Sequence, residues 1–415
     1  MPLPHFYILN LNSYILHLKP SLLLAAGATL ALIQGFACSI AGQHAGVSGK
    51  IVLSEGWKNV IYLIAPRGFD EVAANYSGTV VDSAVIGPDG RFAFENLPDQ
   101  PRPALYQLTV QPVSSRYPTM LTDEVPLSAN YMPVVLSHGS PVSINAEIDR
   151  FQASFTMEKP SPDNEALLNL RTIRQSTYQV MQAELEDAKT PDEHRLLEQE
   201  DAVHRFQLPM MAFADSTRSF WAALAAVRWV SPQNDYERVP EFLDAQCRKW
   251  SGLSAENAFA AQLCAKTAAG MLPVLKGEEI PDYALPMSTG DTVHLKQLLG
   301  AKITILDIWA SWCMPCRREN KEWLAPLWSD YAGQGLQIIG YSIDSGAEAW
   351  QKALKIDAAT WPQASHLMGD DAPLMTEFRI STIPANFILD ASGTVIAKNV
   401  HGADLKNFID TYLNP

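Results

Sequence analysis

The sequence contains few of the residues that usually mark a metal or cofactor site. Among 415 residues there are five cysteines and nine histidines. None of them shows the paired Cys/His spacing that is typical of zinc binding. Five cysteines are also too few for a disulfide-rich scaffold. We therefore expect no metal and no cofactor.

Charged residues are scarce as well. They make up 18% of the chain, and the formal net charge is −14. This negative charge argues against nucleic acid and against anionic membrane surfaces as partners. The hydrophobic content of 47% predicts a folded, globular chain. Because 415 residues exceed what one hydrophobic core usually organises, we expect several domains.

Residues 1–42 predict a targeting segment. Lys19 precedes the apolar run Ser21–Ala37, and small residues follow, which is typical of a signal peptide and its cleavage site. Cys38 stands where a lipoprotein carries its acylated cysteine, although Gly35 occupies a position that usually holds leucine. An uncleaved membrane anchor is the alternative, and no later stretch is long and apolar enough to span a bilayer. We expect export to the periplasm or another extracytoplasmic compartment, with membrane anchoring left open.

Residues 43–150 have the composition of a β-rich domain. Short runs of β-branched residues recur between prolines and turn residues, which favours a small antiparallel β-sandwich. The turn sequence Gly87-Pro88-Asp89-Gly90 predicts a hairpin between Val81–Ile86 and Arg91–Phe94. No acid–base or phosphate-binding pattern occurs in this domain.

Residues 151–272 predict a helical connecting domain. Asp163 is a candidate N-cap for a helix whose apolar residues recur at helical spacing. The stretch Phe220–Trp229, rich in alanine and aromatic residues, is expected in the core. Cys247 and Cys264 fall on the last two predicted helices. Their spacing fits either a disulfide across a helical hairpin or two buried thiols.

The stretch Ile303–Glu319 (ITILDIWASWCMPCRRE) concentrates the chemistry of the chain. An apolar, β-favouring run ends in Cys313 and Cys316, and helix-forming residues follow at once. At the first turn of a helix, unpaired N–H groups and the helix dipole stabilise a thiolate, which is the nucleophile of thiol–disulfide exchange. Pro315 is compatible with that first turn. The pattern predicts a redox dithiol in which Cys313 is exposed and attacks, and Cys316 is more covered and resolves.

Residues 273–415 resemble the thioredoxin superfamily, and in particular the TlpA-like thiol–disulfide oxidoreductases. The resemblance rests on the WCMPC motif, on Asp307 six residues before the first cysteine, on Ile383-Pro384 in STIPANFILD, and on Glu319. It implies an α/β thioredoxin-like fold, with a mixed central sheet and helices on both faces. Residues 43–150 look like the β-rich, DUF4369-like module that often precedes such domains.

The resemblance also implies roles for the two acidic residues. Asp307 lies in an apolar strand, where burial raises the pKa of a carboxyl group. As a general base it would accept the proton of Cys316. Glu319 would tune the protonation of the dithiol, and a solvated charge on the helix surface is the alternative. Arg317 and Arg318 are expected on a solvated face.

Substrate contacts are expected around the dithiol. By the resemblance, a cis bond before Pro384 would leave the backbone of Ile383 free to pair with a substrate strand. Trp309 and Trp312 would frame the surface of the site, with Trp312 the more exposed. Met314 and Pro315, between the two cysteines, complete the expected contact surface.

Together these features predict an exported enzyme that reduces protein disulfides through a mixed disulfide. Its partners would be protein disulfide or dithiol substrates and a membrane or periplasmic electron donor. Two other functions compete with this one. The N-terminal domains would form a ligand- or protein-binding platform with an auxiliary redox domain, or the chain would be a thiol peroxidase. The peroxidase needs a Pro-x-x-x-Thr-x-x-Cys setting, which residues 307–312 do not supply.

Overall fold

The computed structural model describes residues 46–72, 78–97, 102–137, 139–187, 192–268 and 270–414. The predicted targeting segment and Cys38 lie outside these residues, so export and lipidation stay predictions. Within the described ranges, no helix combines the length and the apolar character needed to cross a membrane.

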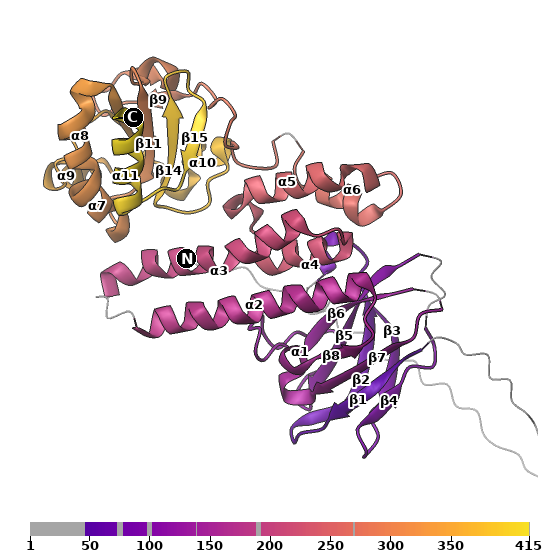
Figure 1. The fold of residues 1–415 in the computed structure, drawn as a ribbon. Helices are drawn as coiled ribbons and strands as arrows, with labels where there is room; N and C mark the ends of the chain where they lie inside the picture. The colour runs from indigo at the N-terminus through magenta and orange to yellow at the C-terminus, as the bar shows by residue number, and fades with distance from the viewer. Residues whose placement is uncertain are drawn as a thin grey trace, which may run out of the picture. The chain divides into compact units, whose positions relative to one another are not determined.

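Two four-stranded sheets form the β-rich part of the chain (Figure 1). Their strand orders are β4-β1-β7-β8 and β3-β2-β5-β6. Every pair of neighbouring strands is antiparallel except β1 and β7, which run parallel, so the predicted sandwich is not wholly antiparallel. The strands are β1 (Val47–Val52), β2 (Trp57–Ala65), β3 (Thr79–Val85), β4 (Arg91–Ala93), β5 (Ala104–Pro112), β6 (Tyr131–Leu136), β7 (Val142–Glu147) and β8 (Thr156–Glu158).

The predicted β-hairpin around the Gly-Pro-Asp-Gly turn is wrong. The turn itself forms, because the N–H of Gly87 donates to the carbonyl of Arg91 at 2.9 Å and the N–H of Gly90 to that of Gly87 at 2.8 Å. However, β3 pairs with β2, and β4 pairs with β1 in the other sheet. Turn residues reverse the chain locally, whereas the partner of each strand depends on which faces are buried.

A helical part follows the sheets. Ser161, rather than the predicted Asp163, caps α2: its hydroxyl oxygen accepts the N–H of Asn164 at 3.3 Å. Asp163 instead accepts a hydrogen bond from the hydroxyl of Ser219 at 2.5 Å. The helices are α1 (Phe151–Ser154), α2 (Pro162–Asp187), α3 (Asp192–Ser216), α4 (Phe220–Val230), α5 (Pro240–Trp250) and α6 (Ala258–Ala265).

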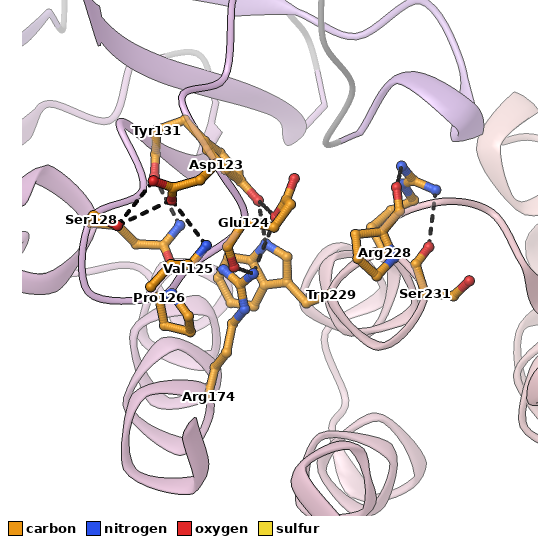
Figure 2. Close-up of polar contacts among 12 residues, drawn as sticks. Asp123, Glu124, Val125, Pro126, Ser128, Tyr131, Arg174, Arg228, Trp229 and Ser231 are labelled. Atoms are coloured by element: carbon orange, nitrogen blue, oxygen red, sulfur yellow. Dashed lines mark hydrogen bonds and ion pairs between the residues drawn. The ribbon is translucent and has the colours of Figure 1, made fainter. Parts of the chain in front are cut away.

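One hydrophobic core extends from both sheets into these helices. The expected burial of the stretch Phe220–Trp229 is confirmed except at Trp221, which is partly buried against the core. Within this region a buried polar cluster joins the sheets to the helices (Figure 2). The indole N–H of Trp229 donates to the hydroxyl of Tyr131 at 2.8 Å, which donates to Glu124 at 2.8 Å. Arg174, 2% exposed, donates to the same carboxylate at 3.1 Å. These hydrogen bonds connect β6, the loop before it, α2 and α4, although Nε of Arg174 is buried without a partner.

Cys247 on α5 and Cys264 on α6 form a disulfide, with Cα atoms 4.8 Å apart. The structure thereby decides between the two alternatives that the spacing left open. The bond joins two consecutive helices whose cysteines are 17 residues apart.

Residues 280–413 contain separate hydrophobic clusters on the two faces of a five-stranded sheet. Its order is β13-β12-β11-β14-β15, with β11, β12 and β13 parallel and β14 and β15 antiparallel to their neighbours, which is the predicted mixed sheet. On one face of β11, Ile303 and Ile305 share a cluster with residues of α8 and α11. On the other face, Leu306 and Ile308 share a cluster with residues of α9 and α10. Helices therefore cover both faces (Figure 1).

The expected helix after the dithiol is interrupted by one π-helical turn, Asn320–Leu324. The strands of this part are β9 (Ala284–Pro286), β10 (Thr292–His294), β11 (Ile303–Trp309), β12 (Leu336–Ser342), β13 (Gln363–Ala364), β14 (Ala385–Asp390) and β15 (Val395–Lys398). The helices are α7 (Met314–Glu319), α8 (Ala325–Tyr331), α9 (Ala347–Ile356), α10 (Pro373–Phe378) and α11 (Gly402–Leu413).

Candidate functional site

Cys313 and Cys316 lie where β11 passes into α7, and they form a disulfide. Cys313 is the N-cap residue of α7, and its sulfur accepts the N–H of Cys316 at 3.3 Å. Pro315 lies in the first turn, as expected. Cys313 is 6% exposed and Cys316 2%, so the order of exposure is as predicted, but the expected exposure of Cys313 is wrong. The sulfur of Cys313 lies among the first N–H groups of a helix, an environment that favours a thiolate.

The loop before β14 brings Ile383 and Pro384 to the same edge of the sheet as the dithiol. In the antiparallel pair β11–β14, Ile308 lies opposite Ala385. The end of β11, from which the cysteines follow, therefore meets the start of β14. The Ile383–Pro384 peptide bond is cis.

Asp307 lies on the face of β11 that α8 and α11 cover, because side chains alternate along a strand and Ile303 and Ile305 share that face. Asp307 is only 3% exposed. Its pKa is raised to about 8, mainly by burial and to a smaller extent by the negative charge of Glu319, while His401 acts in the opposite direction. The burial of Asp307 and the raised pKa are as predicted. A carboxyl group that titrates near neutral pH is suited to general base catalysis.

Glu319, at the end of α7, is 4% exposed, so the alternative of a solvated helix charge is wrong. Its carboxylate accepts hydrogen bonds from Nδ1 of His401 at 3.0 Å and from the N–H of Gly402 at 3.2 Å. His401 has no counterpart among the site residues predicted from the sequence. This residue is the N-cap of α11 and stands 82 residues from Glu319, and no local pattern connects the two.

The two arginines after the dithiol are not on a solvated face. The guanidinium of Arg317 donates to the fully buried carboxylate of Asp357 and to the carbonyl of Ser311 at 3.1 Å. The hydrogen bond to Asp357 raises the pKa of Arg317. Arg318 is 17% exposed and lies 4.0 Å from Glu322. Arg317 therefore holds the segment that precedes Cys313 rather than facing water.

Two large apolar side chains flank Cys313. Trp312 and Met314 are each 59% exposed, which makes them the accessible hydrophobic surface beside the disulfide. The greater exposure of Trp312 was predicted. Trp309 does not frame the site: it is fully buried, and its indole N–H donates to Gln363 at 3.2 Å. Trp309 is the last residue of β11 and packs in the same hydrophobic cluster as the two cysteines.

A search of the described part of the chain finds no group of three or more His, Cys, Asp or Glu side chains that could hold a metal ion. The chemistry available at this edge of the sheet is that of two sulfurs and one titrating carboxyl group, with the hydrogen-bonded pair Glu319–His401 nearby.

The C-terminal part of the chain is similar to known proteins. Residues 276–398 match the AhpC/TSA family. The thiol-disulfide oxidoreductase ResA of Bacillus subtilis (strain 168) is 25% identical over 146 residues, which cover 35% of this chain and 78% of that protein. The thioredoxin-like protein YneN of the same organism is 27% identical over 122 residues, 29% of this chain and 69% of that protein.

Residues 276–398 belong to the thioredoxin superfamily. The thioredoxin-like domain has the fold class and the enzyme class that its sequence predicted, a thiol–disulfide oxidoreductase. The thioredoxin domain of a thiol-disulfide oxidoreductase from Bacteroides vulgatus is 26% identical, with a TM-score of 0.32, and covers 34% of this chain and 99% of that structure. The likeness of residues 43–150 to a DUF4369-like module stays a prediction.

Proposed function

We propose that this protein is an exported oxidoreductase that reduces protein disulfides with the Cys313–Cys316 dithiol. The Cys313 thiolate attacks a substrate disulfide, forms a mixed disulfide and releases the first substrate thiolate. Asp307 accepts the proton of Cys316, whose thiolate attacks the sulfur of Cys313 and releases the second substrate thiolate. Two electrons pass to the substrate, and the enzyme is left with its internal disulfide.

The observation that carries this proposal is the position of the disulfide. It lies at the N-terminus of α7 and beside the start of β14. The strand directly before it, β11, carries the buried Asp307. A nucleophile, a resolving thiol and a base are thus supplied by neighbouring elements. Such a constellation performs exchange without a cofactor.

A folded or partly folded protein is the substrate that suits this surface. Trp312 and Met314 offer apolar area on either side of Cys313. Pro315 and Pro384 limit the flexibility of the two segments that would contact the substrate. The backbone of Ile383 would pair with an extended substrate segment, as strands add to exposed backbone elsewhere.

Export and the direction of electron flow are parts of the same proposal. Residues 1–42 would direct the chain to the periplasm or another extracytoplasmic compartment, with or without retention at the membrane. In that compartment a reductase needs an electron donor in the membrane or the periplasm. Residues 43–150 and 151–272 would be a β-sandwich domain and a connecting domain that carry residues 273–415.

The reduction potential of the dithiol tests the proposal. The protein would be equilibrated with glutathione or dithiothreitol, and Cys313→Ser would serve as the control. A potential of about −250 mV or lower supports reduction of substrates, whereas about −120 to −180 mV would favour disulfide formation or isomerisation. A protein that cannot be reduced and reoxidised at this pair would contradict the proposed function and leave the binding-platform alternative. Hydrogen peroxide, offered as a substrate, would separate the peroxidase alternative.

A further inference from the structure

A hydrogen-bonded pair, Glu319 and His401, acts electrostatically on the buried Asp307. Glu319 comes from the end of α7 and His401 from the start of α11, and their polar atoms are 3.0 Å apart. Glu319 is 4% exposed, and the side chain of His401 is 21% exposed. Contacts this close between largely buried groups are stabilising only when each has its hydrogen-bond partner.

The contact with Glu319 defines the role of Nδ1 of His401. An ionised carboxylate has no hydrogen to donate, so Nδ1 of His401 must be the donor to Glu319. The amide nitrogen of Asn386 lies 3.5 Å from the same Nδ1 and donates instead to the carbonyl of Val400 at 2.7 Å. The second oxygen of Glu319 accepts the N–H of Gly402. The start of α11 therefore orients this carboxylate at both oxygens.

Asp307 is the group on which the pair acts. Asn386, whose side chain lies beside His401, is the residue opposite Asp307 in the register of β11 and β14. The charges of Glu319 and His401 act on Asp307 in opposite directions. An anion close to a buried carboxyl group favours its neutral form, and a cation favours its charged form.

We propose that His401 is a positioning residue of the dithiol site. From the start of α11 it holds the carboxylate of Glu319 and balances its charge, and the Glu319–His401 pair sets how readily Asp307 accepts the proton of Cys316. This inference rests on the proposed function, because it concerns the resolving step of that reaction.

Three further charged groups lie on α7, on α11 and at the end of β15, the strand that precedes α11. Arg318 of α7 pairs with Glu322 of the π-helical turn. Lys398, at the end of β15, donates to the carbonyl of Val274 at 2.8 Å. Asp404, in the first turn of α11, is exposed. Asp404 is therefore the matched control on the same helix.

The resolving step can be observed directly with 5,5′-dithiobis(2-nitrobenzoate). Cys313 of the reduced full chain forms a mixed disulfide and releases one thionitrobenzoate. Cys316 then displaces the second, and a Cys316→Ser variant identifies that second release. Stopped-flow absorbance from pH 5 to pH 10 yields the midpoint of the resolving rate. Circular dichroism and the thermal midpoint of each variant show that it is folded.

We expect Glu319→Gln to lower the midpoint and His401→Gln to raise it, each by about one pH unit. The double variant should return close to the wild-type midpoint, and Asp404→Asn should not move it. A merely structural contact would shift both single variants in the same direction or slow the step equally at every pH.

Two results would overturn the inference. Midpoints of Glu319→Gln and His401→Gln that shift together, or a His401→Gln midpoint equal to that of the wild type, would contradict it and leave the proposed function standing. A wild-type protein that releases only one thionitrobenzoate from the dithiol would overturn both.

Discussion

Ser311 is bound twice by Asp344. The carboxylate of Asp344 accepts the backbone N–H of Ser311 at 2.8 Å and its hydroxyl at 2.5 Å, and it also accepts the hydroxyl of Ser342 at 2.6 Å. Asp344 follows β12, and Ser311 lies two residues before Cys313. With Arg317, which donates to the Ser311 carbonyl, this contact defines the path of the chain into the dithiol.

Replacement of Asp344 should destabilise the segment that leads into the dithiol. Asp344→Ala removes the acceptor of three hydrogen bonds and leaves the N–H of Ser311 unpaired, so we expect a loss of about 2–4 kcal/mol in the free energy of unfolding. Ser311→Ala removes only the hydroxyl contact and should cost about 1 kcal/mol. Urea denaturation of the oxidised proteins checks both values. Equal losses in the two variants would show that the backbone contact contributes nothing.

Asp307 should make the stability of the protein depend on pH. The folded protein holds its proton up to about pH 8, whereas an unfolded chain releases it near pH 4. The folded state therefore binds more protons between these values. The resulting stabilisation is complete below about pH 4 and is lost as the pH rises through about 8.

Asp307→Asn keeps the shape of the side chain without titrating. Relative to this variant, the wild type should lose at most about 1.4 kcal/mol of unfolding free energy per pH unit between pH 5 and pH 8. Urea denaturation of both oxidised proteins at several pH values measures the difference. Parallel pH profiles would show that Asp307 does not titrate in this range.

Serine variants of the two active-site cysteines should differ in whether they form stable mixed disulfides with substrate proteins. Cys316→Ser retains the attacking thiol but cannot resolve, so mixed disulfides with substrate proteins should accumulate. Cys313→Ser should form none above the background. Non-reducing electrophoresis followed by mass spectrometry of the linked peptides reads both outcomes. Accumulation in Cys313→Ser instead would reverse the assignment of attacking and resolving thiols.

The Cys247–Cys264 disulfide should stabilise the chain without serving the dithiol chemistry. It closes a loop of 17 residues, for which chain entropy predicts about 3 kcal/mol. The variant with both residues replaced by serine should unfold at lower urea concentration. Its Cys313–Cys316 reduction potential should equal that of the wild type. A changed potential would indicate that the two disulfides exchange electrons.

Much of the architecture follows from local patterns. Short runs of β-favouring residues placed β3, β4 and β11, and the WCMPC motif indicated a dithiol at a helix start, because residue patterns and turn chemistry act over a few residues. The errors lie where distant segments meet. The residues of β3 and β4 indicated a hairpin, and only the packing of two sheets sends each strand to a different partner.

The sequence by itself determined the reactive pair, its place at a helix N-terminus and the apolar strand that buries Asp307. Only the tertiary structure decided the environment of that carboxyl group. Glu319 has the spacing of an ordinary surface residue, yet α11 covers it and supplies His401 from 82 residues away. Burial and charge depend on which elements pack together, and the spacing of residues along one segment carries no information about the side chains that another segment brings to it.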